Sequence, residues 1–344
     1  MNLEKVVRPN ILALAPYSCA RDEFKGEASV FIDANESPYN NGLNRYPDPR
    51  QWAVKELLAP VKGVKKEQIF LGNGSDEAID LVYRIFCRPG VDNVVAPAPT
   101  YGMYQVCAEI NDVEYRAVPM VAETFALDVE AMAAQVDQNT KVMWICSPNN
   151  PSGNAYSEEQ LVSILERFKD LVVVIDEAYI DFSPIPSMTK YLDKYNNLIV
   201  LQTFSKAWGH AGMRLGIAMA SEEIIAFFSN VKYPYNINEL TQKEALRVLS
   251  DLKKKDRQVE EILGQRVVLN ELLLSLSCVE KIYPSDANFI LVKVKDAPMT
   301  YKYLQDKGII VRSRHKVQLC HNCLRITVGT PAENAELFEA LKAL

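Results

Sequence analysis

Short apolar segments alternate with helix-like segments from residue 69 to residue 220, and this alternation constrains the fold of the 344-residue chain most. Each apolar segment has the length of a buried strand, and the residues after it carry the apolar spacing of a helix. Strands that alternate with helices pair in parallel through right-handed crossovers. The sequence therefore predicts an α/β fold, in which helices sandwich a mostly parallel sheet. The predicted strands are 69–71, 93–96, 115–118, 141–146, 171–175, 198–201 and 217–220.

The chain changes character on both sides of this region. Residues 1–40 are punctuated by Pro and Asn, with a short apolar segment at 30–32 that predicts a strand. After residue 235 the pattern predicts one long helical stretch at 239–276 and then a smaller α+β domain. The strands expected there are 279–284, 289–294, 309–311 and 324–328. The predicted division is an N-terminal arm with part of the small domain at 1–40, a large domain at 41–235 and a small C-terminal domain at 236–344.

Composition and charge argue against several classes of protein. The net charge of -6 and the pI near 5.4 disfavour a nucleic-acid or anionic-membrane partner. No apolar run approaches the roughly 18 to 20 residues of a membrane span, and the first residues lack the apolar core of a signal peptide. Seven scattered cysteines are typical of a reducing cytoplasm. The Cys320-x-x-Cys323 pair lacks further ligands at zinc-site spacing, so we expect a loop there rather than a metal or redox site.

A single lysine lies in a polar loop between two predicted strands. Lys206 follows the hydroxyl residues Thr203 and Ser205, and Arg214 comes eight residues later. A lysine amine on a short loop can condense with a carbonyl, while the hydroxyls and the arginine fork can hold a phosphate. A ligand that carries both a reactive carbonyl and a phosphate is pyridoxal phosphate, so this loop is a candidate site for it. The alternative is a surface turn with a solvated lysine.

Other polar residues follow the predicted strands. Asp176 comes directly after the apolar segment 171–175 and can pair with a protonated pyridine nitrogen, or it can simply cap a helix. Tyr179 can reach a ring hydroxyl. Because function gathers at the carboxyl ends of parallel strands, we expect these residues to face one crevice. The residues placed there are Gly74, Tyr101, Asn150, Asp176 and Lys206.

Three further patterns each have a functional and a plain interpretation. Residues 72–75 before a helix can bind an anion, although Asp76 and an adjacent Glu are awkward there and an ordinary helix start is more common. Tyr101 can stack on a heterocycle or pack in a loop, and Asn150 can donate to a ring oxygen or sit in a proline turn.

The arginines of the small domain differ in their sequence context. Arg325 lies between apolar residues on a predicted strand, whereas we expect Arg314 and Lys316 on a solvated basic hairpin.

The order of these motifs resembles that of the fold-type-I pyridoxal-phosphate aminotransferases of class II. The motifs are 147–153, 176–179, 205–206 and 214. Residues 14–17, 43–47, 99–104 and 323–330 are similar to motifs of the histidinol-phosphate aminotransferases within that class. The resemblance covers nearly the whole chain. It implies a large cofactor-binding domain, a small domain built from both chain ends, and a homodimer with shared active sites.

The resemblance also implies a role for each site residue. Lys206 would carry pyridoxal 5'-phosphate as a Schiff base and act as general base and acid. Asp176 would pair with the pyridine nitrogen, Tyr179 and Asn150 would bond the ring oxygen, and Tyr101 would stack on the ring. The other residues implied in cofactor binding are Gly74, Ser75, Asp76, Thr203, Ser205 and Arg214, with Tyr46 reaching the cofactor of the other subunit. Those implied in substrate binding are Tyr17, Asn35, Arg312 and Arg325.

The implied reaction transfers an amino group between L-histidinol phosphate and 2-oxoglutarate, giving imidazole-acetol phosphate and L-glutamate, in histidine biosynthesis. An aromatic-amino-acid aminotransferase and a threonine-phosphate decarboxylase are alternatives. A non-catalytic cofactor-binding regulator would need an added DNA-binding domain, for which this acidic chain has no spare segment. Two departures from the family pattern leave substrate detail open. Ser37 stands where Asn is common, and residues 208–210 fill a segment that is usually apolar and small.

Overall fold

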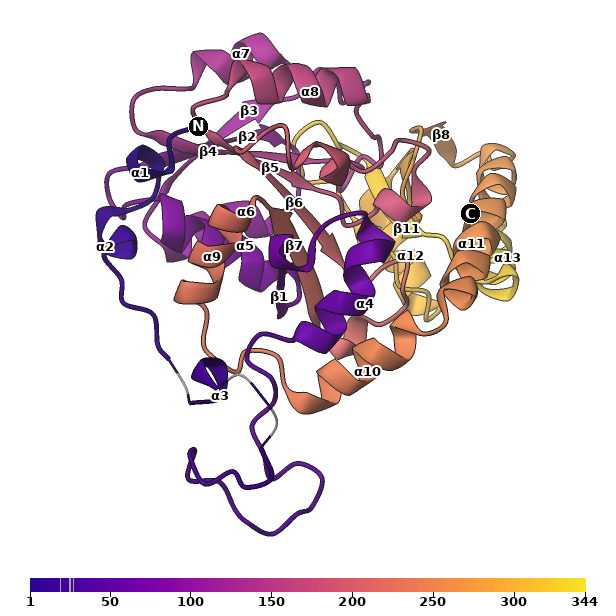
Figure 1. The fold of residues 1–344 in the computed structure, drawn as a ribbon. Coiled ribbons are helices and arrows are strands. Elements are labelled where there is room, and N and C mark those ends of the chain that lie inside the picture. The colour runs from indigo at the N-terminus through magenta and orange to yellow at the C-terminus, as the bar shows by residue number, and fades with distance from the viewer. Residues whose placement is uncertain (19, 25, 27) are drawn as a thin grey trace.

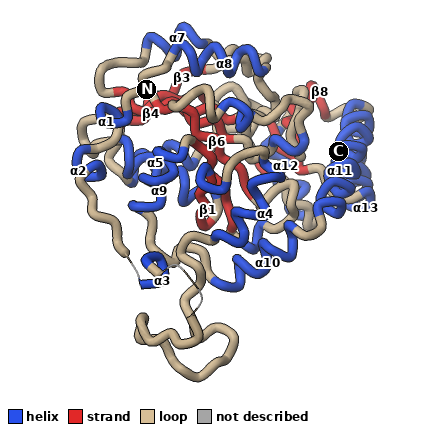
Figure 2. Tube along the Cα trace, in the orientation of Figure 1, coloured by secondary structure: helices blue, strands red, loops and turns tan. Residues whose placement is uncertain are grey.

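The computed structural model describes residues 1–344 except 19, 25 and 27, and it contains two sheets (Figures 1 and 2). The larger sheet has seven strands in the order β1-β7-β6-β5-β4-β2-β3. Strands β2 to β6 pair in parallel, whereas β7 runs antiparallel to both β1 and β6. This arrangement confirms the predicted α/β fold. The strands are β1 (Ile69–Asn73), β2 (Asn93–Ala98), β3 (Glu114–Pro119), β4 (Thr140–Cys146), β5 (Val172–Asp176), β6 (Leu198–Thr203) and β7 (Leu215–Ala220).

Helices bury both faces of this sheet, which is why its central strands are apolar without interruption. Side chains of β5 alternate between two cores: Val173 and Ile175 pack in one, and Val172 and Val174 pack in the other. The first core also takes side chains from α4 (Trp52–Lys62), α7 (Val129–Ala134), α8 (Glu158–Arg167) and α10 (Glu239–Leu249). The second takes side chains from α1 (Leu3–Val6), α2 (Pro9–Leu12), α5 (Ser75–Phe86), α6 (Met103–Ile110) and α9 (Glu222–Val231).

The second sheet is antiparallel, with strand order β10-β11-β9-β8, and it has its own hydrophobic core. Its strands are β8 (Val279–Ile282), β9 (Phe289–Val294), β10 (Arg312–Ser313) and β11 (Cys323–Thr327). Helices α11 (Leu252–Leu274), α12 (Ala297–Asp306) and α13 (Pro331–Lys342) contribute to that core. The position predicted for the third strand, 309–311, is wrong, because pairing with β11 begins only at Arg312. Ile309 and Val311 precede that strand and pack against the core of the second sheet.

Two other predicted elements differ in the structure. The helical stretch expected at 239–276 is two helices, because the Asp251 side chain accepts a hydrogen bond from the Lys254 N–H and starts α11 as a new helix. The strand expected at 30–32 is absent from the described residues. Val30 and Ile32 are 69% and 91% exposed, and no neighbouring strand of the described chain pairs with them.

The segment between α2 and α4, which includes α3 (Ala20–Glu23), projects away from the body of the chain (Figure 1). Before it, Val6, Val7 and Ile11 are buried together with α5 against the larger sheet. The domain limits near residues 40 and 235 stay a prediction. Among the described residues, no helix has the length and apolar character needed to cross a membrane. Six of the seven cysteines are described and carry free thiols, and Cys19 lies outside the described residues.

Candidate active site

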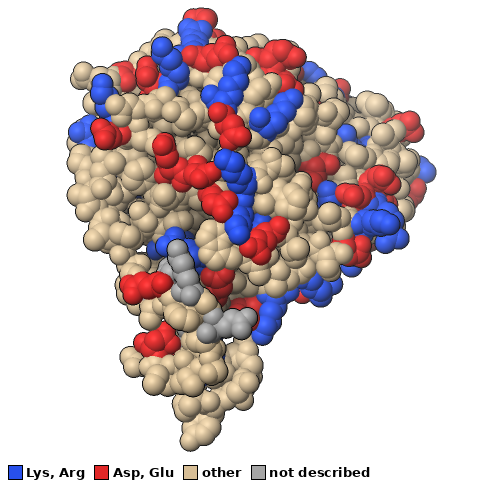
Figure 3. All heavy atoms as spheres, viewed as in Figure 1, with Lys and Arg blue, Asp and Glu red and all other residues tan. Residues whose placement is uncertain are grey.

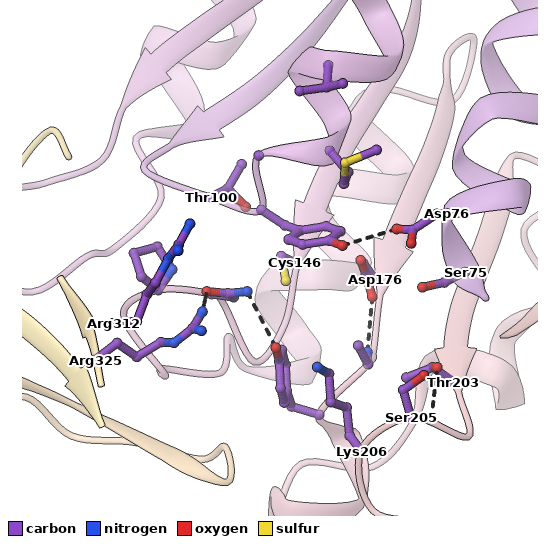
Figure 4. A pocket seen from close by; sticks show the side chains of 18 of the residues that line it. Ser75, Asp76, Thr100, Cys146, Asp176, Thr203, Ser205, Lys206, Arg312 and Arg325 are labelled. Carbon is purple, nitrogen blue, oxygen red and sulfur yellow. Dashed lines mark hydrogen bonds between the residues drawn. The ribbon is translucent and has the colours of Figure 1, made fainter. Parts of the chain in front are cut away.

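A cavity of about 790 Å³ lies between the carboxyl ends of the central parallel strands and the second sheet. It brings together most of the residues predicted from the sequence, because the loops after the parallel strands meet at one edge of the larger sheet. Figure 4 shows Ser75, Thr203 and Ser205 on one side, Arg312 and Arg325 on the other, and Lys206 and Asp176 between them. The predicted residues that line it are Ser75, Asp76, Tyr101, Asn150, Asp176, Tyr179, Thr203, Ser205, Lys206, Arg214, Arg312 and Arg325.

Lys206 is half-buried and points its amine into this cavity (Figure 4). Its Nζ lies 5.6 Å from the centre of the Tyr179 ring. Burial lowers the pKa of the Lys206 amine, and the positive charge of Arg325 lowers that pKa further. A lower pKa makes more of the neutral, nucleophilic amine available for a carbonyl. The alternative of a solvated surface lysine therefore does not describe Lys206.

Asp176 ends β5 and is 2% exposed. Its Oδ2 accepts a hydrogen bond of 2.6 Å from the hydroxyl of Tyr104, and its Oδ1 accepts one of 3.0 Å from the N–H of Ala178. Burial raises the pKa of the Asp176 carboxyl to about 6, while both hydrogen bonds oppose that rise. The bond to Ala178 is a local cap of the kind considered as the alternative. The carboxylate nevertheless lines the cavity.

Tyr104 is a site residue that the sequence did not reveal. It lies on α6, is fully buried, and stacks on Trp144 with ring centres 4.7 Å apart. In the sequence it reads as an ordinary core position on a helix, and only its place within the segment 99–104 marked it. Only the tertiary fold brings its hydroxyl to Asp176, which lies 72 residues later in the chain.

One end of the cavity has the features of an anion site. Ser75 begins α5, and the backbone of Gly74 has a φ of 73° that favours glycine. A Cβ at Gly74 would lie 2.5 Å from Nη2 of Arg214, so a larger residue would displace the guanidinium. Arg214 contacts the Ser205 hydroxyl and the Asp76 carboxylate, each at 3.4 Å. Helix dipole, hydroxyls and guanidinium together fit a phosphate.

Asp76 faces the cavity rather than away from it. Its Oδ1 accepts a hydrogen bond of 3.0 Å from the Tyr101 hydroxyl, and its other oxygen lies near Arg214. Asp76 therefore contacts both the Tyr101 side chain and the Arg214 guanidinium at the anion-binding end of the cavity. The neighbouring Glu77 instead accepts a hydrogen bond from the backbone N–H of Asn73, which stabilises the turn before α5.

Residues from both sheets meet at the other end of the cavity. The Asn150 amide donates to the Tyr179 hydroxyl at 3.4 Å, and Arg325 donates to the Asn150 oxygen at 2.5 Å. The Arg325 guanidinium also lies 5.2 Å from the centre of the Phe289 ring. Arg312 is directly opposite Arg325 in the pairing of β10 with β11. The solvated hairpin predicted for Arg314 is wrong, because Arg314 is half-buried and lines the cavity, while Lys316 is exposed.

Four predicted residues do not line this cavity: Gly74 adjoins its anion-binding end next to Arg214, and the other three lie away from it. Tyr17 is 68% exposed. Asn35 and Tyr46 line a second cavity of about 530 Å³, where Tyr46 stacks on Tyr235 with ring centres 4.3 Å apart. All three belong to the projecting segment or its ends. The single chain therefore does not bring them to Lys206.

Neither of the unusual segments noted in the sequence lines the cavity, although Trp208 follows Lys206 by only two residues. Trp208 is 2% exposed, with the amines of Lys62 and Lys255 near its ring at 5.5 and 5.4 Å. Ser37 is exposed. Cys320 and Cys323 are both buried, and burial raises the pKa of their thiols to about 12 and about 11, which disfavours reactive thiolates. No group of three or more His, Cys, Asp or Glu suited to a metal occurs among the residues that the structure describes.

Comparisons with known proteins give consistent findings. Residues 20–341 match the family described as aminotransferase class I and II. A histidinol-phosphate aminotransferase of Bacteroides thetaiotaomicron is 55% identical over 341 residues, which cover 99% of this chain and 98% of that protein.

Two solved structures extend the likeness to the fold. The histidinol-phosphate aminotransferase from Clostridium acetobutylicum has a TM-score of 0.81 at 23% identity and covers 88% of this chain and 90% of its own. The one from Sinorhizobium meliloti, in complex with pyridoxal-5'-phosphate, has a TM-score of 0.79 at 23% identity, with 87% and 82% covered. At these identities the likeness supports the fold alone.

Proposed function

The chain belongs to the aminotransferase class I and II family, and from this premise we propose that it is a histidinol-phosphate aminotransferase. The reaction transfers an amino group between L-histidinol phosphate and 2-oxoglutarate, giving imidazole-acetol phosphate and L-glutamate, in histidine biosynthesis. The observation that carries the proposal is the 55% identity with a histidinol-phosphate aminotransferase over nearly the whole of both chains. The cavity agrees with it, because an anion site at one end faces arginines at the other (Figure 4).

Pyridoxal 5'-phosphate is the cofactor of this family, and the residues of the cavity fit it. When bound, it supplies a carbonyl that takes up amino groups and a ring that withdraws electrons. Arg214, Ser205, Thr203 and the start of α5 at Gly74 and Ser75 would hold its phosphate. The fit rests on the space that Gly74 leaves for Arg214 and on donors that converge at this end.

The other residues orient the ring and the substrate. Asp176 would hold the proton on the ring nitrogen, and Tyr101 would stack on the ring. Asn150 and Tyr179, which are hydrogen-bonded to each other, would donate to the ring oxygen. Arg325 and Arg312 would bind the anionic group of the substrate.

Lys206 would do the covalent and proton-transfer work. Its amine would link the cofactor to the protein, and its lowered pKa favours the neutral form that such a link needs. The same amine would act as the general base that takes the proton from the substrate Cα and as the general acid that gives it back.

The substrate is tested with the purified protein. L-Histidinol phosphate and L-phenylalanine are each offered with 2-oxoglutarate, and L-glutamate is measured. We expect much faster turnover of L-histidinol phosphate. Faster turnover of L-phenylalanine would favour the aromatic aminotransferase, and release of carbon dioxide from L-threonine phosphate without amino transfer would favour the decarboxylase.

We also propose that the protein acts in the cytoplasm as a homodimer with shared active sites. The projecting segment carries exposed apolar side chains, which are typical of an interface, and in Figure 3 this part of the molecule is mostly uncharged. These side chains are Tyr17, Val30, Ile32, Tyr39 and Leu43. Tyr46 would then complete the phosphate site of the partner chain, which explains why it lies outside the Lys206 cavity of its own chain.

Mixing two inactive variants tests the shared site. Tyr46→Ala and Lys206→Ala are each expected to be inactive as homodimers, whereas a hybrid dimer regains one site with both residues intact. After exchange of subunits, activity should return to about a quarter of the wild-type value, because about half of randomly paired dimers are hybrids. The control mixes Lys206→Ala with Asp176→Asn, which lie in one cavity of one chain, so no activity should return. Hybrids of Tyr46→Ala and Lys206→Ala without activity would mean that Tyr46 serves its own chain.

A further inference from the structure

Three arginines gather at the end of the cavity that lies away from Arg214. Arg312 and Arg325 face each other across β10 and β11, and Arg314 follows two residues after Arg312 on the same hairpin. Burial is the main cause that lowers the pKa of Arg314 to about 10, and the positive charges of Arg325 and Arg312 contribute to the same shift. Burial also lowers the pKa of Arg325, whose neighbours include Arg312. The three guanidiniums therefore act electrostatically on one another.

No carboxylate of the described residues forms an ion pair with any of these three arginines. Arg325 has a neutral partner in Asn150, and the Nε of Arg314 is buried without a hydrogen-bond partner among the described atoms. Tyr179 and the Cys320 thiol also act on Arg314, but burial raises the pKa of both groups and keeps them neutral. Positive charge that is partly buried without a counter-charge destabilises the protein unless an anion binds.

The number of arginines indicates what kind of anion fits. A carboxylate carries one charge and two oxygens, which one guanidinium fork satisfies. A phosphate monoester carries close to two charges and three terminal oxygens at one point, so further guanidiniums can bind it. L-Glutamate also carries two negative charges, but they lie on two separate carboxylates rather than at one point.

We infer that Arg314 is a third substrate-binding arginine, and that it selects phosphate monoester dianions over carboxylates. This inference rests on the proposed function, because it assigns a specificity residue to the same substrate end. Its counterpart on the hairpin is Lys316, which carries the same charge two residues later but is exposed and does not line the cavity. Lys316 is therefore a matched control for a change in hairpin charge.

The experiment compares Arg314→Gln with Lys316→Gln in the holoenzyme. The half-reactions with L-histidinol phosphate and with L-glutamate are followed separately by the absorbance of the cofactor. For Arg314→Gln we expect kcat/KM for L-histidinol phosphate to fall about ten- to a hundredfold, with a smaller loss for L-glutamate. Arg314→Lys, which keeps the charge but not the fork, should recover part of the loss. Lys316→Gln should leave both half-reactions unchanged.

Inorganic phosphate separates this inference from the proposed function. As an inhibitor of the L-glutamate half-reaction, it should bind the wild-type holoenzyme more tightly than acetate does, and Arg314→Gln should remove most of that difference. Equal losses for both substrates, or unchanged phosphate inhibition in a folded Arg314→Gln holoenzyme, would overturn the inference. If the wild type does not use L-histidinol phosphate, the proposed function fails, while the phosphate measurement still decides the role of Arg314.

Discussion

Lys206→Ala is expected to lower amino transfer by about ten-thousandfold or more, because one amine supplies both the attachment of the cofactor and the proton transfer. The geometry that motivates this is the position of the amine in the cavity between Asp176 and Tyr179, together with its lowered pKa. The variant should still bind pyridoxal phosphate, because the residues proposed for the phosphate are unchanged. Steady-state rates with L-histidinol phosphate and 2-oxoglutarate measure the loss.

Reduction with borohydride locates the attachment directly. In the wild-type protein it should fix the cofactor to the peptide that carries Lys206, and in Lys206→Ala it should fix none. Lys62→Met is a suitable control, because burial also lowers the pKa of Lys62, but this amine lies against the Trp208 ring outside the cavity. Label on Lys62 or another lysine of the wild type would contradict the assignment.

Asp176→Asn is expected to retain the cofactor but to lose most of the activity. A neutral amide cannot hold the proton on the ring nitrogen, so the ring becomes a poorer electron sink. Removal of one partner of a buried charge pair costs about 3–5 kcal/mol, which corresponds to a rate loss of about a hundred- to several thousandfold. The side chains have nearly the same shape, so a stability close to the wild type is the internal control. Activity close to the wild type would mean that Asp176 acts only as a cap.

The pH dependence gives an independent measurement of the same carboxylate. Asp176 must be ionised to pair with the ring nitrogen, and burial raises the pKa of its carboxyl to about 6. Activity should therefore be present above this pKa and fall as the pH drops through it. Tyr104→Phe removes a hydrogen bond of 2.6 Å that favours the ionised form, so the acid limb of the profile should move to higher pH. An unchanged acid limb in Tyr104→Phe would show that this bond does not tune Asp176.

Much of the fold follows from local patterns in the sequence. The uninterrupted apolar run before Asp176 predicts a strand buried on both faces, and the alternation with helices predicts parallel pairing; the structure has both. The predictions that failed concern features that a local pattern does not determine. Residues 30–32 are apolar enough for a strand but have no partner in the described chain, and pairing is a property of two segments rather than of one.

Some residues of the candidate site could likewise be predicted from the sequence, whereas others could not. Lys206, Asp176 and Arg214 could be selected from the sequence, because each follows or joins strands whose ends must meet at one edge of the sheet. Arg314 and Lys316 have the same charge and nearly the same neighbours in the sequence, and only the hairpin between β10 and β11 turns the first toward the cavity and the second toward solvent.

The sequence alone determined the order of strands along the chain and the residue types at their ends, because both depend on neighbours a few positions apart. Only the tertiary structure decided that Tyr104 bonds to Asp176, that three arginines share one end of the cavity, and that Tyr46 lies outside it. These relations join residues that are many positions apart. They depend on how helices and the second sheet pack against the first, and no local pattern carries that information.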